Sequence, residues 1–176
     1  ERKKKNTILG LEDEEGNWCN TKEGIADIAV PYFQKLYTTS YPSRVAEVIA
    51  TIPTRVTSEM NQSLMKEFTR EEVEEALKQM HLTKTPGPDG MSTIFFQKYW
   101  NIVGNDVRCM VLNVLNSNMS MVEIIKTNIA LVPKTKNPTK MTEFRPISLS
   151  NVVYKLVSKV LANRLKTILP QIITEN

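Results

Sequence analysis

Basic side chains dominate the second half of the chain, and their spacing suits a phosphate-rich partner. Between residues 126 and 166 the only acidic residue is Glu143. The basic residues of this stretch are Lys126, Lys134, Lys136, Lys140, Arg145, Lys155, Lys159, Arg164 and Lys166. Lys and Arg side chains gain free energy when they release counterions condensed on phosphates, so the pattern indicates a polyanionic partner. A solvated basic surface that serves solubility is the alternative interpretation.

The formal net charge of +4 hides an uneven distribution of charge along the chain. Residues 1–80 contain 11 Lys and Arg against 14 Asp and Glu, whereas residues 81–176 contain 12 against 5. We therefore expect phosphate contacts in the second part of the chain rather than in the first.

No group of residues has the spacing of a catalytic site. The single histidine, His81, has no nucleophile motif beside it, which argues against a hydrolase triad. The four aspartates are Asp13, Asp27, Asp89 and Asp106. They include no adjacent pair of the kind that holds two metal ions, and the Pro- and Gly-rich residues 86–90 lack the spacing of a phosphate-binding P-loop. We expect no catalytic residue, no metal and no bound cofactor in this chain.

Cysteine spacing and hydropathy indicate the environment in which the chain works. Cys19 and Cys109 have no neighbouring Cys or His that would give a metal-binding spacing. We expect reduced, buried thiols in an intracellular protein that is nuclear, cytoplasmic or both. Lys, Asn or Ser interrupts every long hydrophobic stretch, so we expect neither a membrane-spanning helix nor a membrane partner.

The composition supports a folded scaffold for these residues, and the first half of the chain contains several local folding signals. The 176 residues are 41% hydrophobic and 24% charged, values close to those of globular domains. Residues 8–11 and 18–19 are expected to form two short strands around a turn at Gly16 and Asn17. Thr21 is expected to cap a helix over residues 25–36, which Pro31 should kink or shorten.

Residues 37–53 are predicted to form a linker with one helical turn at residues 45–50. Thr69 and Glu72 form a capping box that begins an amphipathic helix. That helix should end before the turn at residues 85–90, where Asp89 is free to accept hydrogen bonds from backbone amides.

The basic half is predicted to contain helices around a small hairpin. Two packed helices are expected between residues 92 and 115, separated at residues 104–106. Residues 129–132 and 146–149 are strand candidates, and the turn between them has three lysines at residues 134–140. A last amphipathic helix should begin at Val152 and end at Pro170, with Lys155, Lys159 and Lys166 opposite its apolar side. The fold class is therefore α+β, predominantly helical, with a small antiparallel β-hairpin.

Four sequence blocks in this order resemble the fingers-side blocks of LINE-type (non-LTR) retrotransposon reverse transcriptases. They are KTPGPDG at residues 84–90, NIALVPK at 128–134, FRPISL at 144–149, and NVVYK at 151–155 with LANRL at 161–165. The preceding residues, including Gly16, Asn17, Trp18 and the helix over 25–36, resemble the region between the endonuclease and polymerase domains of those proteins. The resemblance thus covers nearly the whole chain.

The resemblance implies a fold and a division of the chain. Residues 1–20 would form a β-hairpin of the connector, residues 21–82 a helical connector or linker, and residues 83–176 a partial fingers region of a right-hand polymerase. The palm and the thumb are missing from the chain, which looks like the front part of a larger protein. In the family the fingers pack on the palm, so we expect the apolar face of residues 152–169 to lack its partner here.

The resemblance also implies roles for individual residues. Lys134 and Arg145 are expected to contact the triphosphate of the incoming deoxynucleotide; their alternative is a solvated Lys134 and an Arg145 bonded to loop carbonyls. Template or other nucleic-acid contacts are expected from Pro86, Gly87, Pro88, Asp89, Gly90, Lys136, Lys140, Lys155, Lys159 and Lys166. The alternatives are a plain connector at residues 86–90 and a solvated face for the helix lysines.

The implied function is that of a fragment of an RNA-directed DNA polymerase. Its partners would be an RNA template, a DNA primer, deoxynucleoside triphosphates and the palm and thumb of the same polypeptide. The family's metal-binding aspartates lie beyond the last block, so Mg²⁺ is expected for the full-length polymerase and this chain alone is expected to be inactive. The alternatives are a nucleic-acid-binding module without catalysis and a relic of a retrotransposon.

Overall fold

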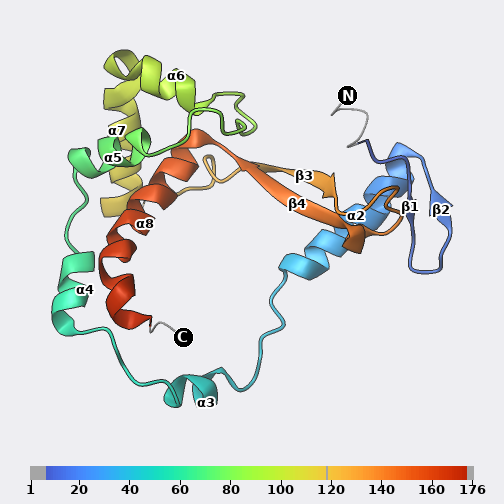
Figure 1. Ribbon diagram of the computed structural model, residues 1–176, viewed down its shortest axis with the longest axis horizontal. Helices are drawn as coiled ribbons and strands as arrows, with labels where there is room; N and C mark the ends of the chain where they lie inside the picture. Colours follow the sequence, from blue (N-terminus) through green and yellow to red (C-terminus); the bar gives the residue numbers. More distant parts are fainter. Residues whose placement is uncertain (1–6, 118, 174–176) are drawn as a thin grey trace. The chain divides into compact units, whose positions relative to one another are not determined.

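The computed structural model describes residues 7–117 and 119–173 (Figure 1). The chain folds into two units. The first unit combines the described residues up to 51 with residues 129–148, and the second combines residues 52–128 with the described residues from 149 onward. The three-part division predicted from the sequence also includes residues 1–6, 118 and 174–176, which lie outside the described residues, and it stays a prediction.

A short hairpin begins the first unit. Strands β1 (Leu11–Glu12) and β2 (Trp18–Cys19) pair antiparallel, with Leu11 opposite Cys19. One carboxylate oxygen of Asp13 accepts the N–H groups of Glu15 and Asn17 at 2.9 and 2.8 Å. Gly16 has a φ of +86°, a conformation that glycine adopts without steric cost. The predicted turn is confirmed, although the first strand is shorter than residues 8–11.

Helix α2 (Lys22–Tyr37) follows the hairpin. The Oγ1 atom of Thr21 accepts the N–H of Gly24 at 3.1 Å, which confirms the predicted cap. Pro31 lies inside the helix and does not shorten it, and the alternative, a kink at Pro31, stays a prediction. Proline removes one N–H donor from the helix, and this cost is offset because Ile28 and Phe33, on either side of it, pack on the core of the unit.

The second sheet of the chain is a two-stranded hairpin of β3 (Thr127–Pro133) and β4 (Phe144–Ser150). A single 3₁₀ turn, η1 (Met141–Glu143), precedes β4, and the N–H of Lys134 bonds the carbonyl of Glu143 at 2.8 Å. Both predicted strands are confirmed and are longer than expected. Met141 and Phe144 form the buried core of the first unit with Leu11, and Leu131 packs against it.

Two short helices occupy the region before the capping box. Helix α3 (Val45–Ala50) confirms the predicted helical turn. Helix α4 (Ser58–Leu64) was not expected from the sequence. Thr57 caps it, since its Oγ1 atom accepts the N–H of Met60 at 3.2 Å. The signal that was available is this Thr followed by Glu59 in the first turn.

Helix α5 (Arg70–Lys78) begins at the predicted capping box. The N–H of Thr69 donates to the Glu72 carboxylate at 2.8 Å, and the N–H of Glu72 donates to Thr69 Oγ1 at 3.4 Å. The apolar face of the helix is buried in the core of the second unit through Val73, Ala76 and Leu77.

Helices α6 (Thr93–Lys98) and α7 (Trp100–Asn116) are separated at Tyr99. The prediction of a break at residues 104–106 is wrong, because Gly104 lies buried within α7. A Cβ atom there would come within 2.8 Å of the Trp100 indole, so glycine serves close packing against the preceding turn rather than a helix end.

Helix α8 (Val152–Ile172) packs against α5 and α7 in the second unit (Figure 1). Val152, Leu156, Val157 and Val160 are each at most 2% exposed, so the expectation that this face lacks a partner is wrong for the first half of the helix. Apolar residues of the second half are 37–45% exposed; they are Leu161, Leu165 and Leu169.

Pro170 does not end α8 where the sequence predicted, because the helix continues to Ile172. The missing N–H of proline removes one bond in the last turn only. Ile173, which has extended backbone, caps the end by donating its N–H to the carbonyl of Leu169 at 2.9 Å. In the part of the chain that the structure describes, no helix is long and apolar enough to cross a membrane.

Candidate nucleic-acid interface

The Pro- and Gly-rich loop at residues 85–90 lies directly against the start of α8. A Cβ atom on Gly87 would come within 2.3 Å of Asn151 Oδ1, 2.4 Å of Asn151 N and 2.5 Å of the Ser150 carbonyl carbon. Two of these atoms belong to the backbone, which cannot move aside like a side chain. Glycine is therefore required for this contact between the loop and the helix.

A hydrogen bond to Asn151 and hydrogen bonds within the loop hold the same segment in place. The N–H of Asp89 donates to Asn151 Oδ1 at 3.3 Å. The Asp89 carboxylate accepts the N–H of Met91 at 3.0 Å, which confirms the predicted bond between this side chain and a backbone amide. The N–H of Gly90, whose φ is +70°, bonds the carbonyl of Gly87 at 3.1 Å. The turn is thus ordered by its own residues and by Asn151.

Lys155 adds a third attachment for the loop. Its Nζ atom donates to the carbonyl of Thr85 at 2.8 Å. Burial lowers the pKa of the Lys155 ammonium below its ordinary value, and the positive charge of Lys84 contributes in the same direction. This lysine was expected to contact template phosphate, and in the structure its ammonium group is directed to the protein backbone.

The two other lysines predicted along α8 lie in different surroundings. Lys159 is half-buried, and its side chain makes no hydrogen bond or ion pair with residues of the described ranges. Lys166 is exposed in a groove that it lines together with Glu71, Glu72 and Glu75 of α5. Three carboxylates beside Lys166 weaken its attraction for phosphate.

The tip of the β3–β4 hairpin lies in the first unit, and its lysines also differ. Lys134 Nζ donates to the carbonyl of Thr142 at 2.7 Å. Lys140 Nζ lies 3.9 Å from the Glu12 carboxylate, while Lys136 is exposed. Arg145 is exposed on β4, and its side chain has no hydrogen bond or ion pair to the part of the chain that the structure describes. All four residues predicted at this hairpin are exposed, but only the side chains of Arg145 and Lys136 have no partner among the described residues.

Glu143 organises the backbone of the hairpin tip. Its carboxylate accepts the N–H of Thr139 at 2.8 Å and that of Lys140 at 3.1 Å. These two bonds, the one from Thr139 first, lower the pKa of Glu143 below its ordinary value. The one acidic residue of the basic stretch therefore shapes the turn between the strands.

Arg164 belongs to the basic stretch by sequence but is used inside the second unit. Its guanidinium donates to both carboxylate oxygens of Glu72 at 2.6 and 2.8 Å. It also donates to backbone carbonyls of Leu64, Lys66 and Glu67, and it lies 3.5 Å above the centre of the Phe68 ring. This structural role removes one cation from the set available to a polyanion. The sequence offered one signal for it, the position of Arg164 in the LANRL block beside apolar residues.

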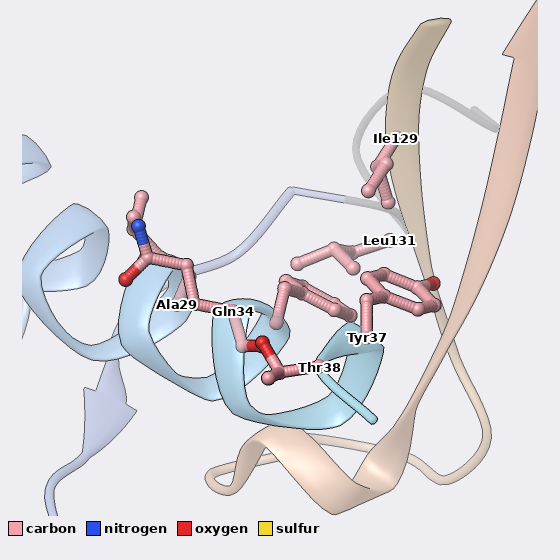
Figure 2. A pocket seen from close by; sticks show the side chains of 8 residues that line it. Ala29, Gln34, Tyr37, Thr38, Ile129 and Leu131 are labelled. Atoms are coloured by element: carbon pink, nitrogen blue, oxygen red, sulfur yellow. The ribbon is translucent and has the colours of Figure 1, made fainter. Parts of the chain in front are cut away.

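An apolar pocket of about 600 Å³ lies between α2 and β3 in the first unit (Figure 2). Its walls include Phe33 and Tyr37 from α2 and Ile129 and Leu131 from β3. No charged residue lines it, so it does not suit phosphate. Sequence reasoning did not anticipate this pocket, because strand and helix come from segments about 90 residues apart in the chain.

Other candidates for chemistry are few in the described ranges. These ranges contain no group of three or more His, Cys, Asp or Glu residues that could hold a metal ion. His81 lies in the turn after α5, where its Nδ1 atom accepts the N–H of Thr83 at 3.3 Å. Both cysteines are free, as expected; the prediction that they are buried is wrong, since Cys109 is exposed and Cys19 is half-buried.

Comparison with known proteins gives one informative match. No family model matches the chain. The chain is 29% identical over 177 aligned residues to the Transposon TX1 uncharacterized 149 kDa protein of Xenopus laevis. The alignment covers 98% of this chain and 14% of that protein, so the chain spans about a seventh of its relative.

Similarity along almost the entire chain supports an origin in a transposon of this kind. It agrees with the LINE context of the sequence resemblance, while the reverse-transcriptase activity and the roles of individual residues stay predictions.

Proposed function

We propose that the chain forms part of the fingers of a LINE-type reverse transcriptase and contributes contacts to the triphosphate of the incoming deoxynucleotide and to the template. Four ordered sequence blocks and the similarity to a transposon-encoded protein support this proposal. The fold class of the family's fingers belongs to the same proposal, as do the RNA template and the DNA primer as partners.

The observation that carries the proposal is the contact between two of the four blocks. Residues 84–90 and residues 151–155 are far apart in the sequence, and the bond between Asp89 and Asn151 spans 62 positions. Thr85, Gly87 and Asp89 of the first block each contact Asn151 or Lys155 of the fourth block. Blocks that serve one function are expected to meet in space, and here the contacts use the residues that make the blocks recognisable.

Arg145 fits the triphosphate role in this proposal. A guanidinium that makes no bond to the described residues can offer its forked donors to phosphate oxygens. Lys134 would first have to release the carbonyl of Thr142, which it bonds at 2.7 Å. We therefore assign the larger share of triphosphate binding to Arg145.

The chemistry of nucleotide addition requires groups that the described residues do not hold. They contain no cluster of carboxylates fit for Mg²⁺, so the chain's own part is to bind and orient substrates. We expect the purified chain to incorporate no deoxynucleotide in a primer-extension reaction with magnesium and template RNA. Incorporation above background would contradict this assignment.

The test of the proposed function is primer extension by the polypeptide translated from the element's complete reading frame. We expect RNA-templated incorporation, and we expect Arg145→Ala to raise the KM for deoxynucleotides by about tenfold or more with a smaller change in kcat, because a charge-assisted contact to substrate is lost. The control is Arg44→Ala, which removes an exposed arginine outside the four blocks. Equal KM values for the two variants would contradict the role of Arg145.

A second candidate is a nucleic-acid-binding module without catalysis. The exposed Lys136 and Arg145, together with the unbonded Lys159, favour it because they suffice for phosphate contacts. Salt-dependent binding of RNA by the chain, with no activity from the complete reading frame, would support this candidate over the polymerase.

A further inference from the structure

We infer that Lys155 and Asn151 are positioning residues, which hold the loop at residues 85–90 in one pose on α8 instead of binding template phosphate themselves. This inference rests on the proposed function, in which the loop faces the template. It assigns different roles to two of the three lysines of α8: Lys155 orders the loop and Lys159 is available to phosphate, while Lys166 lies in the groove with Glu71, Glu72 and Glu75.

The surroundings of Lys155 explain the first assignment. Its ammonium group donates to the carbonyl of Thr85 at 2.8 Å, whereas the side chain of Lys159, which is half-buried to a similar degree, bonds no described residue. Burial and the nearby positive charge of Lys84 lower its pKa, in agreement with an ammonium group directed to the protein. A lysine that binds phosphate through a solvated tip would have neither this hydrogen bond to the backbone nor this lowered pKa.

Asn151 is used in a way that differs from most residues at its position. It is the N-cap residue of α8, where an Asn side chain normally accepts an N–H of the helix's own first turn. No such bond is present; instead its Oδ1 atom accepts the N–H of Asp89 at 3.3 Å. The Asn151 side chain therefore stabilises the loop and not the end of its own helix.

Close packing makes the pose of the loop specific. Gly87 approaches the Asn151 backbone so closely that no Cβ atom fits, and the bonds from Asn151 and Lys155 lie on either side of this contact. Pro88, Asp89 and Gly90 are left exposed at the apex. A loop that is ordered before it meets its partner loses less conformational entropy on binding, so its attachments raise affinity without touching the partner.

Lys159 provides a matched comparison, since it lies one helical turn after Lys155 and makes no bond to the described residues. The experiment compares Lys155→Met with Lys159→Met in the intact chain, with Lys155→Arg and Asn151→Ala as further variants. Two quantities are measured: hydrogen exchange of the backbone amides at residues 85–91, and the salt dependence of binding to an RNA template annealed to a shorter DNA primer. Thermal melting identifies any variant that fails to fold.

We expect Lys155→Met and Asn151→Ala to accelerate exchange in the loop by about tenfold, because each removes one attachment. We expect Lys155→Arg to restore slow exchange and Lys159→Met to leave it unchanged. In the binding measurement, Lys159→Met should reduce the magnitude of the slope of log K against log salt by about 0.7 to 0.9, whereas Lys155→Met should lower affinity without changing the slope.

The possible failures are distinguishable. If the unaltered chain shows no salt-dependent binding, the proposed function fails and the positioning role fails with it. If the unaltered chain binds but Lys155→Met reduces the slope as Lys159→Met does, with unchanged exchange in the loop, Lys155 is a phosphate ligand and only the inference is overturned. A Lys155→Met variant that fails to fold leaves the decision to Asn151→Ala, where unchanged exchange overturns the inference.

Discussion

Arg164 has all of its donor groups directed to partners within the second unit, and it shows how residue type alone misleads about function. Its side chain is 13% exposed, and it joins Glu72, the ring of Phe68 and three backbone carbonyls before α5. Hydrogen bonds that involve a charged group contribute about 1.5 to 3 kcal/mol each at most, and the loss of one partner of a buried ion pair costs more than the pair contributes. Sequence reasoning counted Arg164 among cations for a polyanion, because the acids and carbonyls that surround it lie about 90 to 100 positions earlier.

Replacement of Arg164 is predicted to destabilise the second unit strongly. Arg164→Met should lower the free energy of unfolding by about 2 to 4 kcal/mol, because Glu72 and the carbonyls lose their donor. Arg164→Lys should recover only part of this loss, since an ammonium cannot make the forked contact. Urea denaturation measures both values, and Lys166→Met, which removes an exposed cation two residues later, is the control with a change below about 0.5 kcal/mol. Equal effects at residues 164 and 166 would contradict the structural role.

The same ion pair predicts a pH dependence of stability. Hydrogen bonding by Arg164 lowers the pKa of Glu72 in the folded state below the ordinary value of 4.5. A carboxyl group with a depressed folded pKa adds stability above its unfolded pKa and loses it as the pH falls through the folded pKa. We expect the free energy of unfolding to decrease below about pH 4.5, and we expect Glu72→Gln and Arg164→Met to reduce this dependence. Urea titrations at a series of pH values provide the measurement, and an unchanged pH profile in Glu72→Gln would count against the coupling.

At the scale of elements, caps and strands that depend on residues close in sequence were predicted, whereas packing between residues far apart in sequence was not. The capping box of Thr69 and Glu72, the cap at Thr21 and the strands around the hairpin were predicted because each depends on residues close in sequence. The break between α6 and α7 was predicted at the wrong position, because a glycine such as Gly104 can mark either a helix end or a close packing contact. The contact with the Trp100 side chain, which shows that Gly104 serves packing, depends on the folded structure. Pro31 and Pro170 do not end their helices, because packing around Pro31 and the backbone bond from Ile173 to Leu169 offset the cost of the missing N–H groups.

Gly104→Ala is the element-scale test of that interpretation. Alanine raises helix propensity by about 1 kcal/mol, yet its Cβ would lie 2.8 to 3.2 Å from atoms of the Trp100 indole. Overpacking costs about 1 to 3 kcal/mol, so we predict a net loss of about 1 kcal/mol. Asn105→Ala, at the adjacent exposed position of α7, should instead stabilise the protein slightly. Thermal melting compares the two, and a stabilised Gly104→Ala variant would show that the indole moves without cost.

At the scale of the whole molecule, the sequence shows which blocks resemble the family but does not show which blocks contact one another in the fold. The four blocks were recognisable by their residues, and the mixed fold with a basic hairpin could be expected from periodicity and turn residues. Asn151 was overlooked as a site residue, because its contact with Asp89 depends on how α8 packs on the rest of the second unit. The phosphate contacts stay predictions, but the surroundings of the cations differ. The side chains of Arg145, Lys136 and Lys159 have no partner among the described residues, and Lys166 has none but lies beside three carboxylates. Lys155 and Lys134 donate to carbonyls, and Lys140 lies 3.9 Å from Glu12.

The central claim, that this chain contacts nucleic-acid phosphates through a few unpaired cations, is tested most directly by the salt dependence of binding to an RNA template annealed to a DNA primer. If the three cations Lys136, Arg145 and Lys159 contact phosphate, log K should fall with log salt at a slope of about −2 to −3. The double variant Lys136→Gln and Arg145→Gln should reduce the magnitude of that slope by about 1.4 to 1.8, and a control double variant, Lys35→Gln and Arg44→Gln, should leave it unchanged. A flat salt response of the unaltered chain, or equal slopes for the two double variants, would contradict the account.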